Sequence, residues 1–319
     1  MATILCAVLL LGAPLAAQAQ PGKTPRVGVL ALEECPGRET VFGAGLKDLG
    51  YAWGQTLHVV CRSAEGDLRR LPETAAGLAA ERPDLIVALT HVTYAARRAT
   101  ASIPIVMIAS GDPIRTGLVA TLARPGSNVT GLTYYAAELT EKRLELLKEL
   151  VPDANRVGVL GNPESDHVFR IYRQDAERAA RVLRLQLLVR DASHPRDLDA
   201  AFETFAKDSA QGVRVLVDPM LRTQAQRIVN LAARHRMPTM YWGPWFMDAG
   251  GLVAYSPDYA AMVRRTAYYV DRILKGTRPA DLPVEQPTKF ELIVNVRTAR
   301  ALGLSVPPAL LARADKVLD

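Results

Sequence analysis

The chain lacks an apolar run long enough to cross a bilayer, and it lacks the residue patterns of common catalytic and metal sites. Its N-terminal apolar stretch, residues 4–11, falls well short of the roughly 20 residues that a membrane span needs. The five histidines show no H-x-x-x-H or H-E-x-x-H spacing, and neither a G-x-S-x-G nor a G-x-x-x-x-G-K-[ST] motif occurs. The sequence therefore predicts a protein that is not an enzyme and that uses no metal or cofactor.

Basic runs interleaved with aromatic residues are also absent, although the formal net charge is +6. The arginines and lysines are scattered over predicted helices, which is typical of a solvated surface. We therefore expect no nucleic-acid partner. The length of 319 residues suffices for two domains, and the content of 49% hydrophobic and 23% charged residues is typical of a globular protein.

The N-terminus has the pattern of a secretory signal peptide. The apolar core is followed by Ala17-Gln18-Ala19, an A-x-A site that predicts cleavage after Ala19, so that residues 1–19 are removed. No Lys or Arg precedes the core, which makes the first residues atypical. We expect export and a mature protein in the periplasm.

Only two cysteines, Cys35 and Cys61, follow the predicted signal peptide. In an oxidising compartment an even pair favours a disulfide. The two residues lie near the carboxyl ends of the first two predicted strands, which would be neighbours in a parallel sheet. Two unlinked thiols remain the alternative, because a sequence does not give the Cα separation of roughly 6 Å that a bridge requires.

Apolar strands and amphipathic helices alternate along the chain in two successive series. The strand "RVGVLGN" at 156–162 resembles "RVGVLAL" at 26–32 and opens the second series. Continuous apolar strands separated by helices indicate parallel sheets covered on both faces. The predicted helices are 40–49, 68–81, 94–99, 117–122, 138–150, 168–183, 197–207, 223–235, 259–274 and 298–302. We predict an α/β fold of two doubly wound, Rossmann-like lobes.

The last part of the chain is too short for a third core and is expected to return to both lobes. Crossings near residues 133, 256 and 287 would form a hinge around a cleft. The N-terminal lobe would then contain residues 26–132 and 256–285. The C-terminal lobe would contain residues 133–255 and 286–319.

Small polar and aromatic residues at the predicted strand ends form the candidate ligand site. In open α/β sheets ligands bind beyond the carboxyl ends of the strands. Hydroxyl and N–H groups suit a carboxylate, an Asp suits an ammonium group, and aromatic rings suit a side chain. The candidates are Thr90, His91, Ser110, Gly111, Asp112, Asn162, Asp218, Tyr241, Trp242 and Tyr255.

Several candidates have a purely structural explanation as well. Asp112-Pro113 and Asp218-Pro219 both have the pattern of a helix N-cap followed by proline. Thr90 also suits a cap, and His91 suits an ordinary surface position. Tyr241 and Trp242 suit a core between the lobes. Both explanations stay open at this point, since a cap and a ligand contact can coincide.

Several long stretches resemble one group of bacterial ABC transporter substrate-binding proteins. They include "GDPIRTGLVATLARPGSNVTGLTYYAAELTEKRLELLKELVP", "AGGLVAYSPD" and "YVDRILKGTRPADLPVEQPTKFELIVNVRTARALGLSVPP", and the resemblance spans essentially the whole mature chain. It implies a type I periplasmic binding fold, delivery of a small solute to a membrane permease, and no catalysis. Some relatives are linked to uptake of tryptophan or other aromatic amino acids.

Together these observations predict a solute-binding protein that closes around a small organic ligand, such as an amino acid, between two lobes. We expect Thr90 and Ser110 to hold a carboxylate, and Asp218 or Asp112 to hold a cation. The pocket for the ligand's side chain is expected to be lined by Tyr241, Trp242 and Tyr255. We expect a monomer that works with an ABC permease. A ligand sensor for a membrane receptor or kinase, and an α/β enzyme of another type, are the alternatives.

Overall fold

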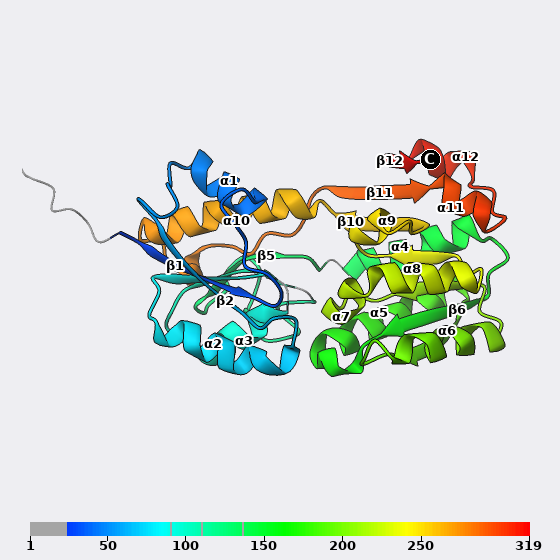
Figure 1. The fold of residues 1–319 in the computed structure, drawn as a ribbon, viewed down its shortest axis with the longest axis horizontal. Helices are drawn as coiled ribbons and strands as arrows, with labels where there is room; N and C mark the ends of the chain where they lie inside the picture. Colours follow the sequence, from blue (N-terminus) through cyan, green and yellow to red (C-terminus); the bar gives the residue numbers. More distant parts are fainter. Residues whose placement is uncertain (1–23, 90, 110, 136) are drawn as a thin grey trace, which may run out of the picture.

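The computed structural model describes residues 24–319 except Thr90, Ser110 and Ala136. The predicted signal peptide therefore lies outside the described residues. The described chain forms two α/β lobes that lie side by side (Figure 1). No helix in this part of the chain is long and apolar enough to cross a membrane.

The first lobe contains a five-stranded parallel sheet with strand order β2-β1-β3-β4-β5. Its strands are β1 (Arg26–Ala31), β2 (His58–Ser63), β3 (Leu85–Leu89), β4 (Ile105–Ala109) and β5 (Val129–Thr133). One face is covered by α1 (Val41–Asp48) and α10 (Tyr259–Leu274), and the other by α2 (Leu71–Ala80) and α3 (Val92–Ala99). A short 3-10 turn, η1 (Leu68–Arg70), precedes α2.

The second lobe contains a seven-stranded sheet with order β12-β11-β10-β9-β8-β6-β7, in which only the β10–β11 pair is antiparallel. Its strands are β6 (Arg156–Gly161), β7 (Gln186–Asp191), β8 (Gly212–Val215), β9 (Thr239–Tyr241), β10 (Val253–Pro257), β11 (Phe290–Asn295) and β12 (Lys316–Leu318). Its helices are α4 (Ala137–Leu150), α5 (Asp166–Leu183), α6 (Asp197–Lys207), α7 (Pro219–Thr223), α8 (Ala225–Arg234), α9 (Trp245–Asp248), α11 (Val296–Ala301) and α12 (Pro308–Ala312). A 3-10 turn, η2 (Pro163–Ser165), precedes α5, whereas η3 (Pro279–Asp281) lies beside β5 of the first lobe.

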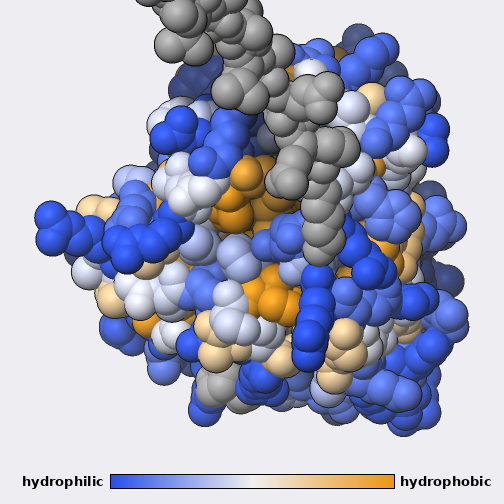
Figure 2. Space-filling view, turned by 90° about the vertical axis from the view of Figure 1, so that its left-hand side faces the viewer, coloured by the Kyte–Doolittle hydropathy of each residue, from blue (hydrophilic) through white to orange (hydrophobic). Residues whose placement is uncertain are grey.

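The apolar strands form the cores of the two sheets, as their sequences predict. Residues 85–88 of β3 and 105–108 of β4 are each at most 1% exposed. Burial on both faces explains why these strands are continuous apolar runs with no polar alternation. Figure 2 shows the end of the molecule formed by the first lobe, where hydrophilic residues cover most of the surface and small apolar areas lie between them.

The chain passes between the lobes at three places. It leaves β5 for α4, and it returns from β10 to α10, which packs on the first sheet. It then runs beside β5, where the amide of Glu285 donates to the carbonyl of Gly131 at 3.0 Å, before entering β11. The exact lobe boundaries at residues 133, 256 and 286 stay a prediction from the sequence.

The prediction of two doubly wound α/β lobes is confirmed, with one local error. The helix predicted at 117–122 is absent from the structure, and hydrogen-bonded turns follow Asp112 instead. The backbone of Gly117 has φ +72°, a left-handed conformation that interrupts a right-handed helix. The short elements α9, α12 and β12 were not predicted, because three to five residues are too few to show a period. For α7, only the Asp218-Pro219 cap pattern indicated a helix start.

A disulfide joins Cys35 to Cys61, and the two Cα atoms are 6.0 Å apart. Cys61 lies in β2, opposite Val29 of β1 in the parallel register. Cys35 lies in the loop between β1 and α1. The bridge therefore ties this loop to the carboxyl end of the first sheet.

Candidate functional site

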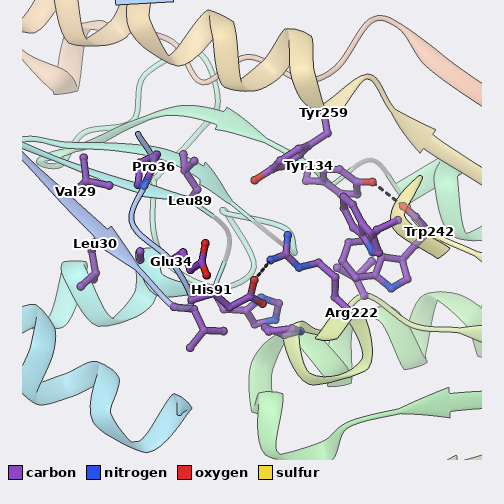
Figure 3. Close-up of a pocket in the computed structure, with 16 residues that line it drawn as sticks. Val29, Leu30, Glu34, Pro36, Leu89, His91, Tyr134, Arg222, Trp242 and Tyr259 are labelled. Atoms are coloured by element: carbon purple, nitrogen blue, oxygen red, sulfur yellow. Dashed lines mark hydrogen bonds and ion pairs between the residues drawn. The ribbon is translucent and has the colours of Figure 1, made fainter. Parts of the chain in front are cut away.

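A cavity of about 530 Å³ lies between the two lobes (Figure 3). The first lobe contributes the end of β1, the loop that follows it, and the end of β3. The second lobe contributes α7, α9 and residues beside them. The lining residues are Val29, Leu30, Ala31, Leu32, Glu33, Glu34, Pro36, Leu89, His91, Tyr134, Val217, Pro219, Arg222, Trp242, Trp245 and Tyr259.

An ion pair between Glu33 and Arg222 crosses this cavity from one lobe to the other. Each side chain is about one third exposed, at 35% and 36%. Figure 3 shows the guanidinium of Arg222 pointing across the cavity toward the first lobe. The same guanidinium lies 5.3 Å from the centre of the Trp245 ring, within the range of a cation–π contact. The cavity therefore holds an acid and a base next to an aromatic wall.

Four aromatic side chains form that wall. Ring centres are 6.1 Å apart for Tyr134 and Trp242, 4.8 Å for Trp242 and Trp245, and 5.9 Å for Trp245 and Tyr259. All three contacts are edge-to-face, a favourable arrangement of aromatic quadrupoles. The wall is built from residues of both lobes and of the crossing between β5 and α4, so its geometry depends on how the lobes meet.

Tyr134 ties the crossing to the second lobe. Its hydroxyl donates to the carbonyl of Trp242 at 2.7 Å (Figure 3), and its side chain is buried. Burial raises the pKa of the Tyr134 hydroxyl well above its usual value. The group therefore remains a hydrogen-bond donor at neutral pH and fixes the neighbouring Trp242.

A second polar contact joins the lobes away from the cavity. Arg115, in the turn after β4, contacts Asp175 of α5 at 3.1 Å. The hydroxyl of Tyr135 donates to the other carboxylate oxygen of Asp175 at 2.8 Å. Arg115 also donates to the side-chain oxygen of Gln174 at 2.7 Å. These bonds stabilise the arrangement of lobes in which the cavity is formed.

Two of the predicted site residues line the cavity, His91 and Trp242. Burial lowers the pKa of His91 to about 4, so its imidazole is neutral at neutral pH. Thr90 and Ser110 lie outside the described residues. Gly111 is buried where the lobes meet, and a Cβ at this position would lie 3.3 Å from Val168.

The two predicted aspartates act as caps. Asp218 is 1% exposed; it accepts from the amide of Leu221 at 2.9 Å and from the hydroxyl of Ser165, and it caps α7. Asp112 accepts from the amides of Ile114 and Arg115 at 2.9 and 3.2 Å and caps a turn. Neither residue lines the cavity, although Pro219, next to Asp218, does.

The remaining three candidates are also absent from the cavity lining. Asn162 is 2% exposed and accepts from the amide of Glu164 at 3.0 Å. Tyr241 is 1% exposed and stacks on Phe246 with 4.7 Å between ring centres, so it belongs to the core of the second lobe. Tyr255 stacks on Phe290 and lines a separate cavity of about 500 Å³ near the crossings.

Arg222, Tyr134, Trp245 and Tyr259 line the cavity without having been predicted. Tyr134 and Tyr259 directly follow two of the predicted crossings between the lobes. This position was the feature of the sequence that could have identified them as cavity residues. Arg222 and Trp245 lie on the very short helices α7 and α9, whose sequences show no period. Among the described residues, no group of three His, Cys, Asp or Glu side chains could hold a metal ion.

Two parallel-sheet lobes around a central cavity define the architecture of a solute-binding protein. The chain belongs to the family of ABC transporter substrate binding proteins, whose family model matches residues 26–318. Members of this family are extracytoplasmic proteins that bind small ligands and work with ABC permeases. They are not enzymes, in agreement with the sequence-based expectation.

Relatives and solved structures agree with this assignment. The chain is 26% identical over 286 residues to a tyrosine-binding protein of Clostridioides difficile, covering 88% of this chain and 82% of the relative. A conserved domain protein of Vibrio cholerae has a TM-score of 0.85 at 28% identity and covers 92% of this chain and all of that one. A Streptococcus pneumoniae ABC domain in complex with L-Trp has the same fold, with a TM-score of 0.85 at 22% identity over 93% of this chain and all of that one.

Proposed function

We propose that this protein is the solute-binding component of an ABC importer and that it closes around an aromatic amino acid. The observation that carries the proposal is the cavity between the lobes, which combines four aromatic side chains with the Glu33–Arg222 pair. A volume of about 530 Å³ lies within the range of small-molecule sites, roughly 300–1,000 Å³.

The charged pair suits the two charges of an amino acid. The guanidinium of Arg222 can form two parallel hydrogen bonds with a carboxylate, and Glu33 can accept from an ammonium group. In the structure the two side chains bind each other. A zwitterion placed between the two side chains would replace this one ion pair by two, one at each of its charges. Neither Glu33 nor Arg222 would then lose its charged partner.

The aromatic wall suits the side chain of such a ligand. Tyr134, Trp242, Trp245 and Tyr259 present ring faces and edges against which another ring can stack. The curated relative is named a tyrosine-binding protein, and one structure of the same fold holds L-Trp. These names support an aromatic ligand here. Trp242 is the residue that we retain from the predicted side-chain pocket, and we assign Tyr241 and Tyr255 structural roles.

The cellular setting of the proposal follows the sequence. We infer that the signal peptide is cleaved after Ala19, that the mature protein is a periplasmic monomer, and that its closed form engages a permease. The crossings between the lobes would act as the hinge. Since a ligand shifts a conformational equilibrium only by its preference for one state, contacts made to both lobes at once favour closure.

A thermal-shift screen of the twenty amino acids and of small carboxylates tests the ligand class. We expect L-tyrosine or L-tryptophan to raise the melting temperature and glycine to have no effect. A rise with small carboxylates or sugars, and none with any amino acid, would contradict the proposal.

A further inference from the structure

Two arginines are completely buried in the second lobe. Arg143 lies on α4 and Arg214 lies on β8, and both are 0% exposed. The helix α4 packs against β8, and a Cβ on Gly212, which shares a face of β8 with Arg214, would lie 3.2 Å from Leu147, one turn after Arg143 on α4. Both arginines therefore lie in the interface between α4 and β8. Two like charges are therefore held together inside a protein core.

Most of the polar atoms of this pair lack a hydrogen-bond partner. Arg143 Nε donates to the carbonyl of Tyr255 at 2.7 Å, and Arg214 Nη1 donates to the carbonyl of Val215. Both Nη atoms of Arg143, and Nε and Nη2 of Arg214, have no partner among the described residues. Neither guanidinium forms an ion pair with a carboxylate of the residues that the structure describes.

The surroundings of the pair are hydroxyl groups and apolar side chains. Tyr134 and Tyr172 interact electrostatically with both arginines, and each is 2% exposed. The hydroxyl of Thr140, one turn before Arg143 on α4, is also buried and has no partner within the described part of the chain. Donors thus outnumber acceptors in this cluster, which we define as Thr140, Arg143, Arg214 and the two tyrosines.

Burying two arginines in this way destabilises the folded protein unless a bound group supplies the missing hydrogen bonds and a negative charge. Buried ions require a counter-charge and full hydrogen bonding, and a guanidinium does not escape by losing its proton at physiological pH. Burial lowers the pKa of Arg214 well below its usual value, and Arg143 lowers that pKa further. Unsatisfied buried groups in native proteins commonly mark a bound water or ion. Water would satisfy the hydrogen bonds but would leave both charges without a counter-charge.

We propose that Arg143 and Arg214 hold a small monovalent inorganic anion, such as chloride, inside the second lobe. The anion accepts from the free guanidinium N–H groups and from the hydroxyl of Thr140, and its charge reduces the repulsion between the arginines. Enclosure by side chains that are at most 2% exposed favours an ion of a few ångströms over an organic acid. The site is distinct from the cavity that Tyr134 lines, because that lining does not include Thr140, Arg143 or Arg214.

Anion-dependent melting of the mature protein tests the proposal without any solute. At constant ionic strength, replacing gluconate by chloride or bromide should raise the melting temperature by about 3 °C when the anion exceeds its dissociation constant tenfold. The Arg214→Met variant should lose this difference. It should also fold, because an apolar side chain of similar length removes a buried charge. Arg190→Met is the matched control: Arg190 pairs with Asp208 in the same lobe, so its loss should leave the difference unchanged.

Crystals of the wild-type protein grown in bromide provide a second, independent reading. An anomalous peak between the guanidiniums of Arg143 and Arg214 is expected. Equal melting temperatures in chloride and gluconate, or the same chloride effect in wild type and Arg214→Met, would overturn the proposal. So would a bromide-grown crystal that shows only water between the two side chains.

Discussion

The disulfide between Cys35 and Cys61 should be a large contributor to the stability of the first lobe, and the Cys35→Ala/Cys61→Ala variant removes it. The two cysteines are 26 positions apart in the sequence. In the chain-entropy model, closing a loop of this length stabilises the folded state by about 3.5 kcal/mol. For a lobe of this size, that loss corresponds to a fall in melting temperature of about 10 °C.

The same variant should also weaken solute binding, because the bridge fixes the loop that carries Glu33, Glu34 and Pro36 into the cavity wall. Without the bridge, ordering this loop becomes part of the cost of binding. Urea denaturation and calorimetry of the variant measure the two effects separately. Wild-type protein treated with a reductant should behave like the variant.

The reasoning would be refuted by a loss of less than about 1 kcal/mol, which is well below the entropic value. An unchanged solute affinity in the variant would separately show that the loop is held in place by other contacts. The hydroxyl of Ser63, which donates to the carbonyl of Glu33, is the first such contact to examine.

Three further predictions concern the cavity and its supports. Arg222→Met should lower the affinity for an amino acid, measured by calorimetry, about tenfold to a hundredfold, because it removes a charged hydrogen-bond donor. The control Arg227→Met breaks a surface ion pair with Asp199 and should leave the affinity unchanged. Asp218→Ala should lower the free energy of unfolding, measured by urea denaturation, by about 1 kcal/mol, because the cap of α7 is lost. Asp218→Asn should lower it less, because the amide oxygen of asparagine can still accept from the amide of Leu221. Equal losses in the two variants would contradict the capping role. Since the pKa of His91 is lowered to about 4 from an ordinary 6.5, the unfolded chain takes up a proton first as the pH falls. Stability should therefore decrease between these two values, and His91→Gln should flatten this part of the pH profile of melting.

The sequence predicts the scaffold well because burial on both faces makes the strands continuous apolar runs. The runs at 85–89 and 105–108 are examples, and both are strands in the structure. The order of strands and helices then limits the topology to doubly wound sheets. The resemblance to a known family leads to the same fold by a separate route.

The site is harder to predict because it depends on which way neighbouring side chains point. Tyr241 and Trp242 are adjacent, yet the first stacks in the core and the second lines the cavity. Arg222 lies on α7, a helix of five residues that starts from the cap formed by Asp218. The Asp-Pro pattern thus correctly indicated where α7 starts. The charged group that reaches the cavity, the guanidinium of Arg222, lies near the other end of this helix.

The stretch after β4 shows a similar outcome. Asp112 was a candidate for both a cap and a ligand contact, and the structure shows the cap. Arg115, three residues later, makes the contact to Asp175 in the other lobe. No pattern within the stretch itself indicates that partner, because it is 60 residues away in the sequence.

The most direct test of the account is calorimetric titration of the mature protein with L-tyrosine and L-tryptophan, in parallel with the Arg222→Met variant. The account predicts saturable binding of at least one of the two, with one ligand per chain, and much weaker binding to the variant. Absence of binding of either amino acid to a folded wild-type protein, or equal affinity in the variant, would contradict it.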